Sequence, residues 1–410
     1  MRENHKILRL AWLAVALLLV LAASPAGWSA AKHRVLHAFG NATDGAMPWG
    51  PLTLDDSGKL YGVTLSGGIA HGSYGSGTVF RLSPRANGKW KETILYKSPG
   101  GDYSYPHGGL VIDSKGNLYG TMPLTVFELT PGSGGWNFSA LYTDGAYPGL
   151  LMDGVGNLYG GMGPGQYKAG AIGELSPGSG GWNYAQLYSF CNANSCPDGV
   201  GPPTPPIWDG KGNMFGTTTA GGIYKGCWLW TEGCGVIYEM TPNGDGTWTY
   251  HVLHRFLEHD PKDGQQPYSG LVMDKDGNFY GATANGGQYD QGTVFKFAYS
   301  GGWKETIIYD FPNCAIGCGV AGTLAMDKAG NLYGTAGGGT GNCGLACGVV
   351  FKLSPQKNGK WKYSVVLDLN SETGGAQPLY GVILDGKGNL FGVTSHGGKY
   401  GFGTAFEIIP

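Results

Sequence analysis

An eight-residue signature, D-x-x-G-[NK]-[LMF]-[YF]-G, recurs along the chain and constrains its fold more than any other feature. Its seven copies begin at Asp55, Asp113, Asp153, Asp209, Asp274, Asp327 and Asp385. Successive copies lie between 40 residues apart (Gly120 to Gly160) and 65 residues apart (Gly216 to Gly281). Repeats of this length are typical of chains built from one supersecondary unit used many times.

The chemistry of the signature predicts a β-hairpin. An apolar run such as 109–112 enters as a strand, and the following Asp113 can cap the turn with its carboxylate. The glycine at the fourth position can adopt the positive φ that a tight turn with a bulge requires. Because the motif occurs in every unit, we interpret its aspartates as turn residues and not as a ring of ligands.

Two more strand patterns follow each hairpin, and together they predict the fold. One is G-T-V-F-x-[LF], as at 77–82, and the other is W-x-x-x-x-[LIV]-[YL], as at 90–96. Four short strands per unit are the content of a propeller blade. The 77 glycines, 12% aromatic residues and only 14% charged residues also suit short strands and tight turns. We therefore predict an all-β, seven-bladed β-propeller with four-stranded blades.

The two ends of the repeat region predict how the ring closes. The last unit stops at Pro410, after its third strand. The segment HRVLHAF (33–39) resembles YHVLHRF (250–256), which is a fourth strand. We expect the N-terminal strand to complete the seventh blade and remove its open edge. Residues 32–410 then form a single domain.

The first 31 residues have the features of a secretory signal peptide. Arg2, Lys6 and Arg9 precede an apolar stretch at 10–23, and Ser29-Ala30-Ala31 offers a cleavage site. An uncleaved anchor is the alternative. We expect an exported, secreted or periplasmic protein, monomeric and without membrane association once the signal is removed. The net charge of −2 gives no reason to expect nucleic acid as a partner.

The eight cysteines form four couples that are close in sequence: Cys191/Cys196, Cys227/Cys234, Cys314/Cys318 and Cys343/Cys347. An even number of cysteines in an exported chain favours disulfides over a metal site. Pairing within couples is our expectation, although pairing between two couples of one blade stays open.

The pattern P-x-x-G-L-V-x-D-x-x-G-N-L-Y-G, a Gly-Gly loop and G-T-V-F-K-L resembles the GloVer tandem-repeat family of exported bacterial proteins. The resemblance covers nearly the whole mature chain. It implies a propeller-like exported repeat protein, and it implies no activity. Many members carry a separate C-terminal anchor, and this chain ends at its last strand instead.

Function is expected on the face that carries the blade-to-blade loops and the loops between second and third strands, because these loops vary while the signature turns do not. Aromatic, amide and acidic side chains there suit carbohydrate binding. The candidate ligand-binding residues are Trp49, His71, Tyr105, His107, Trp228, Trp230, Tyr268, Tyr289, Asp290, His396 and Tyr400.

Other functions are weaker alternatives. No catalytic residue is assigned, although His71, His107 and His396 with Tyr105, or Asp102 with Asp290, could serve a secreted polysaccharide lyase or glycoside hydrolase. A structural or protein-interaction scaffold is the third possibility. We expect no cofactor and no metal, since the Asp-Gly aspartates (Asp44, Asp144, Asp198 and Asp263) could bind calcium but are better explained as turn caps. Histidines of the fourth strands, His33, His37, His251 and His254, are expected to be exposed.

Overall fold

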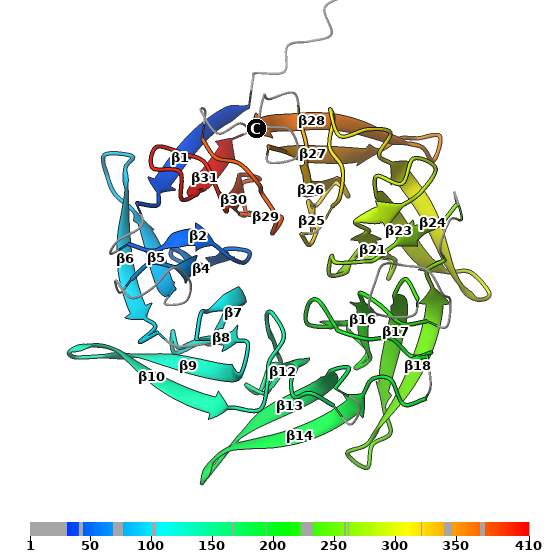
Figure 1. The fold of residues 1–410 in the computed structure, drawn as a ribbon, viewed down its shortest axis with the longest axis horizontal. Helices are drawn as coiled ribbons and strands as arrows, with labels where there is room; N and C mark the ends of the chain where they lie inside the picture. Colours follow the sequence, from blue (N-terminus) through cyan, green and yellow to red (C-terminus); the bar gives the residue numbers. More distant parts are fainter. Residues whose placement is uncertain are drawn as a thin grey trace, which may run out of the picture.

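The computed structural model describes residues 31–40, 44–68, 77–100, 104–165, 168–193, 195–222, 233–257, 260, 262–320, 322–339, 347–369 and 374–409. Seven four-stranded antiparallel sheets are arranged as blades around a central axis (Figure 1). No helix occurs in these ranges, and so none that could cross a membrane. The prediction of an all-β, seven-bladed propeller is confirmed.

The strands have the same four positions in every blade. The innermost strands are β3 (Thr53–Leu54), β7 (His107–Ile112), β11 (Leu151–Met152), β15 (Ile207–Trp208), β20 (Val272–Met273), β25 (Ala325–Met326) and β29 (Val382–Leu384). The second strands are β4 (Leu60–Ser66), β8 (Leu118–Met122), β12 (Leu158–Gly161), β16 (Met214–Thr218), β21 (Phe279–Ala282), β26 (Leu332–Gly337) and β30 (Leu390–Thr394).

The third strands are β5 (Thr78–Pro84), β9 (Thr125–Gly132), β13 (Ala171–Gly178), β17 (Val236–Pro242), β23 (Thr293–Tyr299), β27 (Gly348–Pro355) and β31 (Thr404–Ile409). The outer strands are β6 (Trp90–Lys97), β10 (Gly135–Tyr142), β14 (Gly181–Ser189), β18 (Trp248–Arg255), β24 (Trp303–Asp310), β28 (Trp361–Leu369) and β1 (Lys32–Ala38). Three short strands add to the loops: β2 (Ala46–Pro48), which pairs with β4, and β19 (Gly264–Gln265), which pairs with β22 (Asn285–Gly286).

The signature builds the turn between first and second strands, as predicted. In blade two, the Asp113 carboxylate accepts hydrogen bonds from the backbone N–H groups of Lys115 at 2.9 Å and Asn117 at 2.8 Å. The turn glycine, Gly116, has a φ of 83°. The aspartates of the other six copies accept the same two bonds. These carboxylates are therefore occupied within their own turns.

The last glycine of the signature makes room for the phenylalanine of the third strand. A Cβ atom on Gly120 would lie 2.5 Å from the ring of Phe127 in the neighbouring strand. Blade three has glycine at both positions, Gly160 and Gly173, and a Cβ atom on Gly173 would lie 2.5 Å from the ring of Tyr184 in the outer strand. The motif thus carries a packing constraint as well as a turn.

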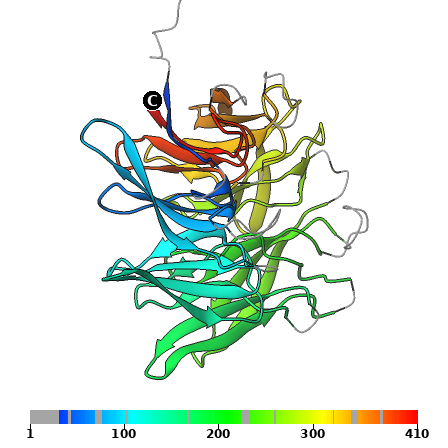
Figure 2. The same cartoon turned by 60° about the vertical axis from the view of Figure 1, so that its left-hand side comes forward.

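The N-terminal strand closes the ring. β1 pairs antiparallel with β31, from Lys32 opposite Ile409 to Ala38 opposite Thr404, and completes the order β1-β31-β30-β29. Leu36 of β1 packs in one buried cluster with Leu52 and Phe80 of blade one. Figure 2 shows the C-terminal end of the chain beside β1. The predicted closure is confirmed.

The antiparallel order separates the connections into two faces. The signature turns and the hairpins between third and outer strands share one face, which we call the turn face. The blade-to-blade connections and the loops between second and third strands share the other, which we call the loop face.

Candidate functional site

The innermost strands surround a central channel that contains a cavity of about 890 Å³. All seven blades contribute to its lining. Each blade contributes an apolar residue just before or within its first strand: Leu52, Leu110, Leu150, Ile207, Leu271, Leu324 and Val382. This volume lies within the range typical of small-molecule sites.

The backbones of neighbouring blades touch around the channel because glycine stands at the contacts. Gly108 has a φ of 73°, and a Cβ atom there would lie 2.4 Å from the backbone nitrogen of Gly149 in the next blade. Gly381 has a φ of 77°, and its Cβ atom would lie 2.3 Å from the carbonyl oxygen of Thr323. Any larger residue at these points would push two blades apart.

Hydrogen bonds between blades satisfy the polar groups of these innermost segments. The Gly108 N–H donates to the Trp49 carbonyl at 2.9 Å, and the Thr53 hydroxyl donates to the Leu110 carbonyl at 2.6 Å. On the other side of the ring, the Gly270 N–H donates to the Thr323 hydroxyl at 3.1 Å. These backbone groups form hydrogen bonds with the neighbouring blade and are therefore not left unpaired at the channel surface. The wall of the channel is mainly apolar.

Three aromatic residues line the cavity near the loop face. Trp49 and Tyr268, two of the predicted ligand-binding residues, are part of the lining, and so is Tyr380. The rings of Trp49 and Tyr380 lie 5.5 Å apart between centroids, while the Tyr268 side chain is 43% exposed. Burial raises the pKa of Tyr380 well above its usual range, so its hydroxyl stays protonated at neutral pH.

No aspartate, glutamate, histidine, lysine or arginine occurs among the described residues that line the cavity. Its polar side chains are the hydroxyls of Thr53, Thr204 and Thr323, the two tyrosine phenols and the Trp49 indole. Such a site can stack against a ring and exchange a few hydrogen bonds, and it has no charge with which to bind an ion.

Tyr105 and His107 come together, but away from the cavity. Their rings are 6.3 Å apart in an edge contact, and His107 is only 8% exposed. Burial lowers the pKa of His107 to about 4, so this histidine is neutral under ordinary conditions.

Four predicted residues lie in the loops between second and third strands, outside the cavity lining. Tyr289 and Tyr400 are 47% and 51% exposed. Asp290 accepts a hydrogen bond from the Gly286 N–H at 3.0 Å and so holds its own loop, while His396 Nδ1 lies 3.0 Å from the Ser395 hydroxyl. The remaining predictions, His71, Trp228 and Trp230, and Asp102 of the catalytic alternative, lie outside the described residues.

Disulfides form within the sequence-close couples wherever the structure describes both partners. Cys191 bonds to Cys196, and Cys314 bonds to Cys318. Cys234 and Cys347 are also disulfide-bonded; the other two cysteines, Cys227 and Cys343, lie outside the described residues. Disulfides of this kind are typical of exported proteins.

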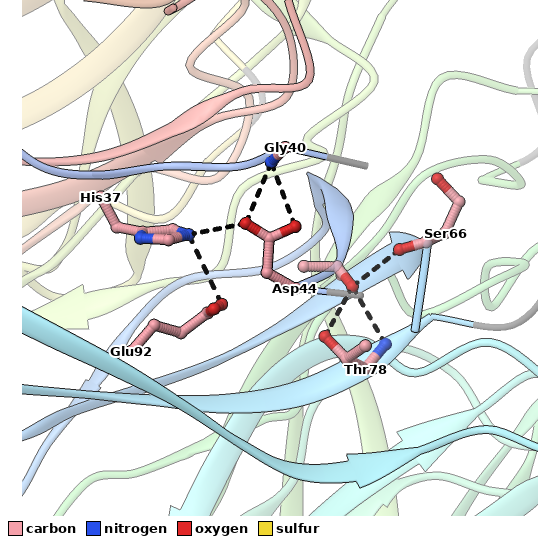
Figure 3. A network of polar contacts seen from close by, with 7 residues as sticks. His37, Gly40, Asp44, Ser66, Thr78 and Glu92 are labelled. Atoms are coloured by element: carbon pink, nitrogen blue, oxygen red, sulfur yellow. Dashed lines mark hydrogen bonds and ion pairs between the residues drawn. The ribbon is translucent and has the colours of Figure 1, made fainter. Parts of the chain in front are cut away.

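The histidines of the outer strands differ from the sequence-based expectation. Only His251 is exposed, whereas His33, His37 and His254 are partly buried between blades. His37 lies beside Asp44 and Glu92 (Figure 3), with its Nε2 atom 3.4 Å from Asp44 Oδ2 and 3.6 Å from Glu92 Oε1. The expectation was wrong because neighbouring segments cover these side chains. His37 and His254 lie against the next blade, near Glu92 and Phe297, whereas His33 lies against Phe406 of its own blade.

Two of the Asp-Gly aspartates, Asp44 and Asp263, accept hydrogen bonds from nearby backbone N–H groups and so act as turn caps. Asp44 accepts bonds from the Gly40 N–H at 3.1 and 3.2 Å, and Asp263 accepts one from the Leu257 N–H at 3.0 Å. Burial, followed by the charge of Asp44, raises the pKa of Glu92 to about 8. Asp44 is therefore both a cap and a member of a polar cluster between blades.

Comparison with solved structures supports the fold. Virginiamycin B lyase from Staphylococcus aureus matches with a TM-score of 0.53 and 13% identity, over 93% of this chain and 99% of that chain. The extracellular domain of BT4673 from B. thetaiotaomicron matches with a TM-score of 0.56 and 10% identity, over 92% of this chain. This chain spans about 40% of the length of that protein. At such identities the likeness concerns the fold alone.

Sequence comparison identifies the family. No curated protein matches the chain. The model of the Gloeobacter/Verrucomicrobia repeat matches residues 206–410, which contain four copies of the signature, from Asp209, Asp274, Asp327 and Asp385. On this match, the chain belongs to the Gloeobacter/Verrucomicrobia repeat family.

Proposed function

We propose that this protein is an exported binding module that holds a neutral ligand, specifically the end of a carbohydrate chain, at the loop-face mouth of its central channel. One observation carries the proposal: the channel contains a cavity of about 890 Å³ with an aromatic rim and no charged residue among its described lining. The disulfides Cys191–Cys196 and Cys314–Cys318 support export.

The lining chemistry favours a neutral ligand over an ion. A charged group moved into this cavity would lose its hydration without meeting an opposite charge, which is costly. A sugar ring has an apolar face that can stack on Trp49 or Tyr268 and hydroxyls that can reach Thr204 or Thr323. Tyr380 supports the stacking surface because its ring packs against Trp49.

The same residues favour binding over catalysis. A glycoside hydrolase needs two carboxylates, and a lyase needs a base near the reacting carbon. The described lining offers only tyrosine phenols as titratable groups, and His107, a histidine of the catalytic alternative, is buried and is not part of the lining.

A glycan array with product analysis by mass spectrometry tests the proposal. The variants Trp49→Ala and Tyr268→Ala should each weaken binding of the best glycan by about 1–3 kcal/mol, as loss of an aromatic anchor does elsewhere. Tyr299→Ala is the matched control, since Tyr299 is 66% exposed at a hairpin of the turn face and should not affect binding.

The result can contradict the proposal in three ways. Equal binding by Trp49→Ala, Tyr268→Ala and wild type would place the ligand elsewhere. Shortened or unsaturated products would favour the hydrolase or lyase. Failure to bind any glycan, together with capture of a protein partner, would favour the scaffold.

A further inference from the structure

Neighbouring outer strands meet at one equivalent position in six of the seven blade-to-blade junctions. At four junctions, two aromatic rings stack there. The pairs are Tyr96–Phe138, Tyr142–Tyr184, Tyr188–Tyr250 and Tyr309–Tyr363, with centroid distances of 4.7, 4.4, 3.9 and 4.4 Å. These junctions are closed by apolar contact and need no ligand.

The junction between blades seven and one has ionisable residues at the same two positions. His37 is equivalent to Tyr188, because His37 lies opposite Ala405 in its sheet just as Tyr188 lies opposite Ile172. Glu92 is equivalent to Tyr250, because Glu92 lies opposite Leu82 just as Tyr250 lies opposite Met240. The blade-to-blade loop adds Asp44, so that three side chains converge from β1, the loop and β6 (Figure 3).

The distances in this cluster are too long for hydrogen bonds and suit a shared cation. His37 Nε2 lies 3.4 Å from Asp44 Oδ2 and 3.6 Å from Glu92 Oε1, and the ligand atoms of all three residues lie within 4.8 Å of one another. Hydrogen bonds of this type span about 2.7–3.2 Å. Zinc bonds of about 2.0–2.2 Å to nitrogen and oxygen give a tetrahedron with edges of about 3.4 Å.

Two atoms of the cluster have no hydrogen-bond partner although they are buried. They are His37 Nε2 and Glu92 Oε1, and the Glu92 side chain is only 11% exposed. In the described part of the chain, no lysine or arginine forms an ion pair with Asp44 or Glu92. Buried polar atoms are normally satisfied, so these two require a partner. Asp44 is held in place by the Gly40 N–H.

We propose that His37, Asp44 and Glu92 bind one Zn²⁺ ion at the junction where the closing strand β1 meets blade one. One imidazole and two carboxylates are a ligand set that zinc accepts, with water in the remaining position. The ion links β1 and β6, and therefore fastens the closure of the ring. This proposal does not depend on the carbohydrate site.

The junction between blades four and five provides an internal comparison. It contains the same residue types, His254, Asp263 and Glu305, at the corresponding positions. There, however, His254 Nε2 is already 3.1 Å from Asp263 Oδ1, which is a hydrogen bond. A metal ion would have to break this bond, so this cluster binds zinc more weakly than the first.

The test is calorimetric titration of untagged, chelator-treated protein with ZnCl₂, alongside CaCl₂ and MnCl₂. We expect one tight zinc site per chain and an increase in melting temperature on zinc addition. Glu92→Gln and Asp44→Asn remove an anionic ligand with little change in shape. Each should weaken the tight site by at least about 10-fold, since loss of a mere supporting group already costs 10–100-fold. Glu305→Gln is the matched control and should retain the tight site.

Several results would overturn the proposal. Wild type could lack a tight zinc site. The tight site could be unchanged in both Glu92→Gln and Asp44→Asn, or it could be lost in Glu305→Gln alone. Circular dichroism of the zinc-free variants checks folding. If one variant fails to fold, the other carries the comparison, and His37→Gln is a third.

Discussion

The junction between blades three and four and the junction between blades seven and one solve the same packing problem with opposite chemistry. Tyr188 and Tyr250 stack at 3.9 Å, and the Tyr188 hydroxyl donates to the Asp198 carboxylate at 2.6 Å. At the other junction, His37, Asp44 and Glu92 approach without forming hydrogen bonds to one another.

The comparison shows that similar loop aspartates have different roles. Asp198 Oδ2 accepts hydrogen bonds from the Tyr188 hydroxyl and the Asn192 N–H, while the buried Asp198 Oδ1 has no hydrogen-bond partner among the described residues. Among the described residues, Asp44 accepts hydrogen bonds from the Gly40 N–H, and it faces two buried atoms without a hydrogen-bond partner, His37 Nε2 and Glu92 Oε1. The polar junction is therefore the weaker contact in the absence of a ligand.

The largest effect is expected from removing the strand that forms one side of the polar junction. Deletion of residues 32–38 removes β1, exposes the edge of β31 and uncovers the cluster around Leu36. We expect loss of a cooperative thermal transition or aggregation. An unchanged melting curve would show that the ring closes without β1.

Breaking the aromatic junction should cost somewhat less. Tyr250→Ala removes a ring that stacks on Tyr188, packs near Tyr238 and donates to the Asp198 carbonyl. We expect a loss of about 3–5 kcal/mol in the free energy of unfolding, measured by urea denaturation. Tyr299→Ala, on the exposed turn face, is the control and should lose less than about 1 kcal/mol.

His107 can be compared with His37, because both histidines are buried or partly buried but only His37 lies beside carboxylates in the described structure. The pKa of His107 is lowered to about 4 by burial, from an ordinary value near 6.5. The folded state therefore binds fewer protons than the unfolded state between these values. The contribution of His107 to the free energy of unfolding should therefore be constant above pH 6.5. It should fall by on the order of 3 kcal/mol as the pH drops to 4.

Denaturation at several pH values measures this dependence. His107→Gln should flatten the curve between pH 4 and 6.5, whereas His251→Gln, at an exposed position of β18, should leave it unchanged. An equal slope in wild type and His107→Gln would show that another group controls the acid range.

The smallest effect is expected from converting one junction into the other. The double variant His37→Tyr/Glu92→Tyr places two aromatic residues where four other junctions have them. In zinc-free buffer it should be more stable than wild type by about 1 kcal/mol, the usual value of an aromatic pair. It should gain nothing from zinc. Lower stability than wild type in chelator would mean that the two positions are not equivalent.

The fold could be predicted from the sequence because its determinants are local. The signature fixes a turn through one aspartate and one glycine, and seven copies reveal the repeat unit. The resemblance of 33–39 to 250–256 then identifies the closing strand. Trp49 and Tyr268 could be placed on the loop face because both lie in blade-to-blade connections, but the sequence did not indicate that they line the channel.

The polar cluster could not be predicted in the same way because its residues come from two blades. His37 and Glu92 meet only after the ring closes, and a histidine on an outer strand suggests exposure when its blade is considered alone. A signal was nevertheless present. The outer strands that precede blades one and five end in His-x-Phe, at His37 and His254. The outer strands of blades one and five themselves begin with Trp-Lys-Glu-Thr, at Trp90 and Trp303.

Anomalous diffraction from crystals soaked in ZnCl₂ would test the difference between the junctions most directly. The account predicts its strongest anomalous peak between His37, Asp44 and Glu92, a weaker peak or none at His254, Asp263 and Glu305, and none at Tyr188, Asp198 and Tyr250. Absence of a peak at the first cluster, or a stronger peak at the tyrosine junction, would contradict it.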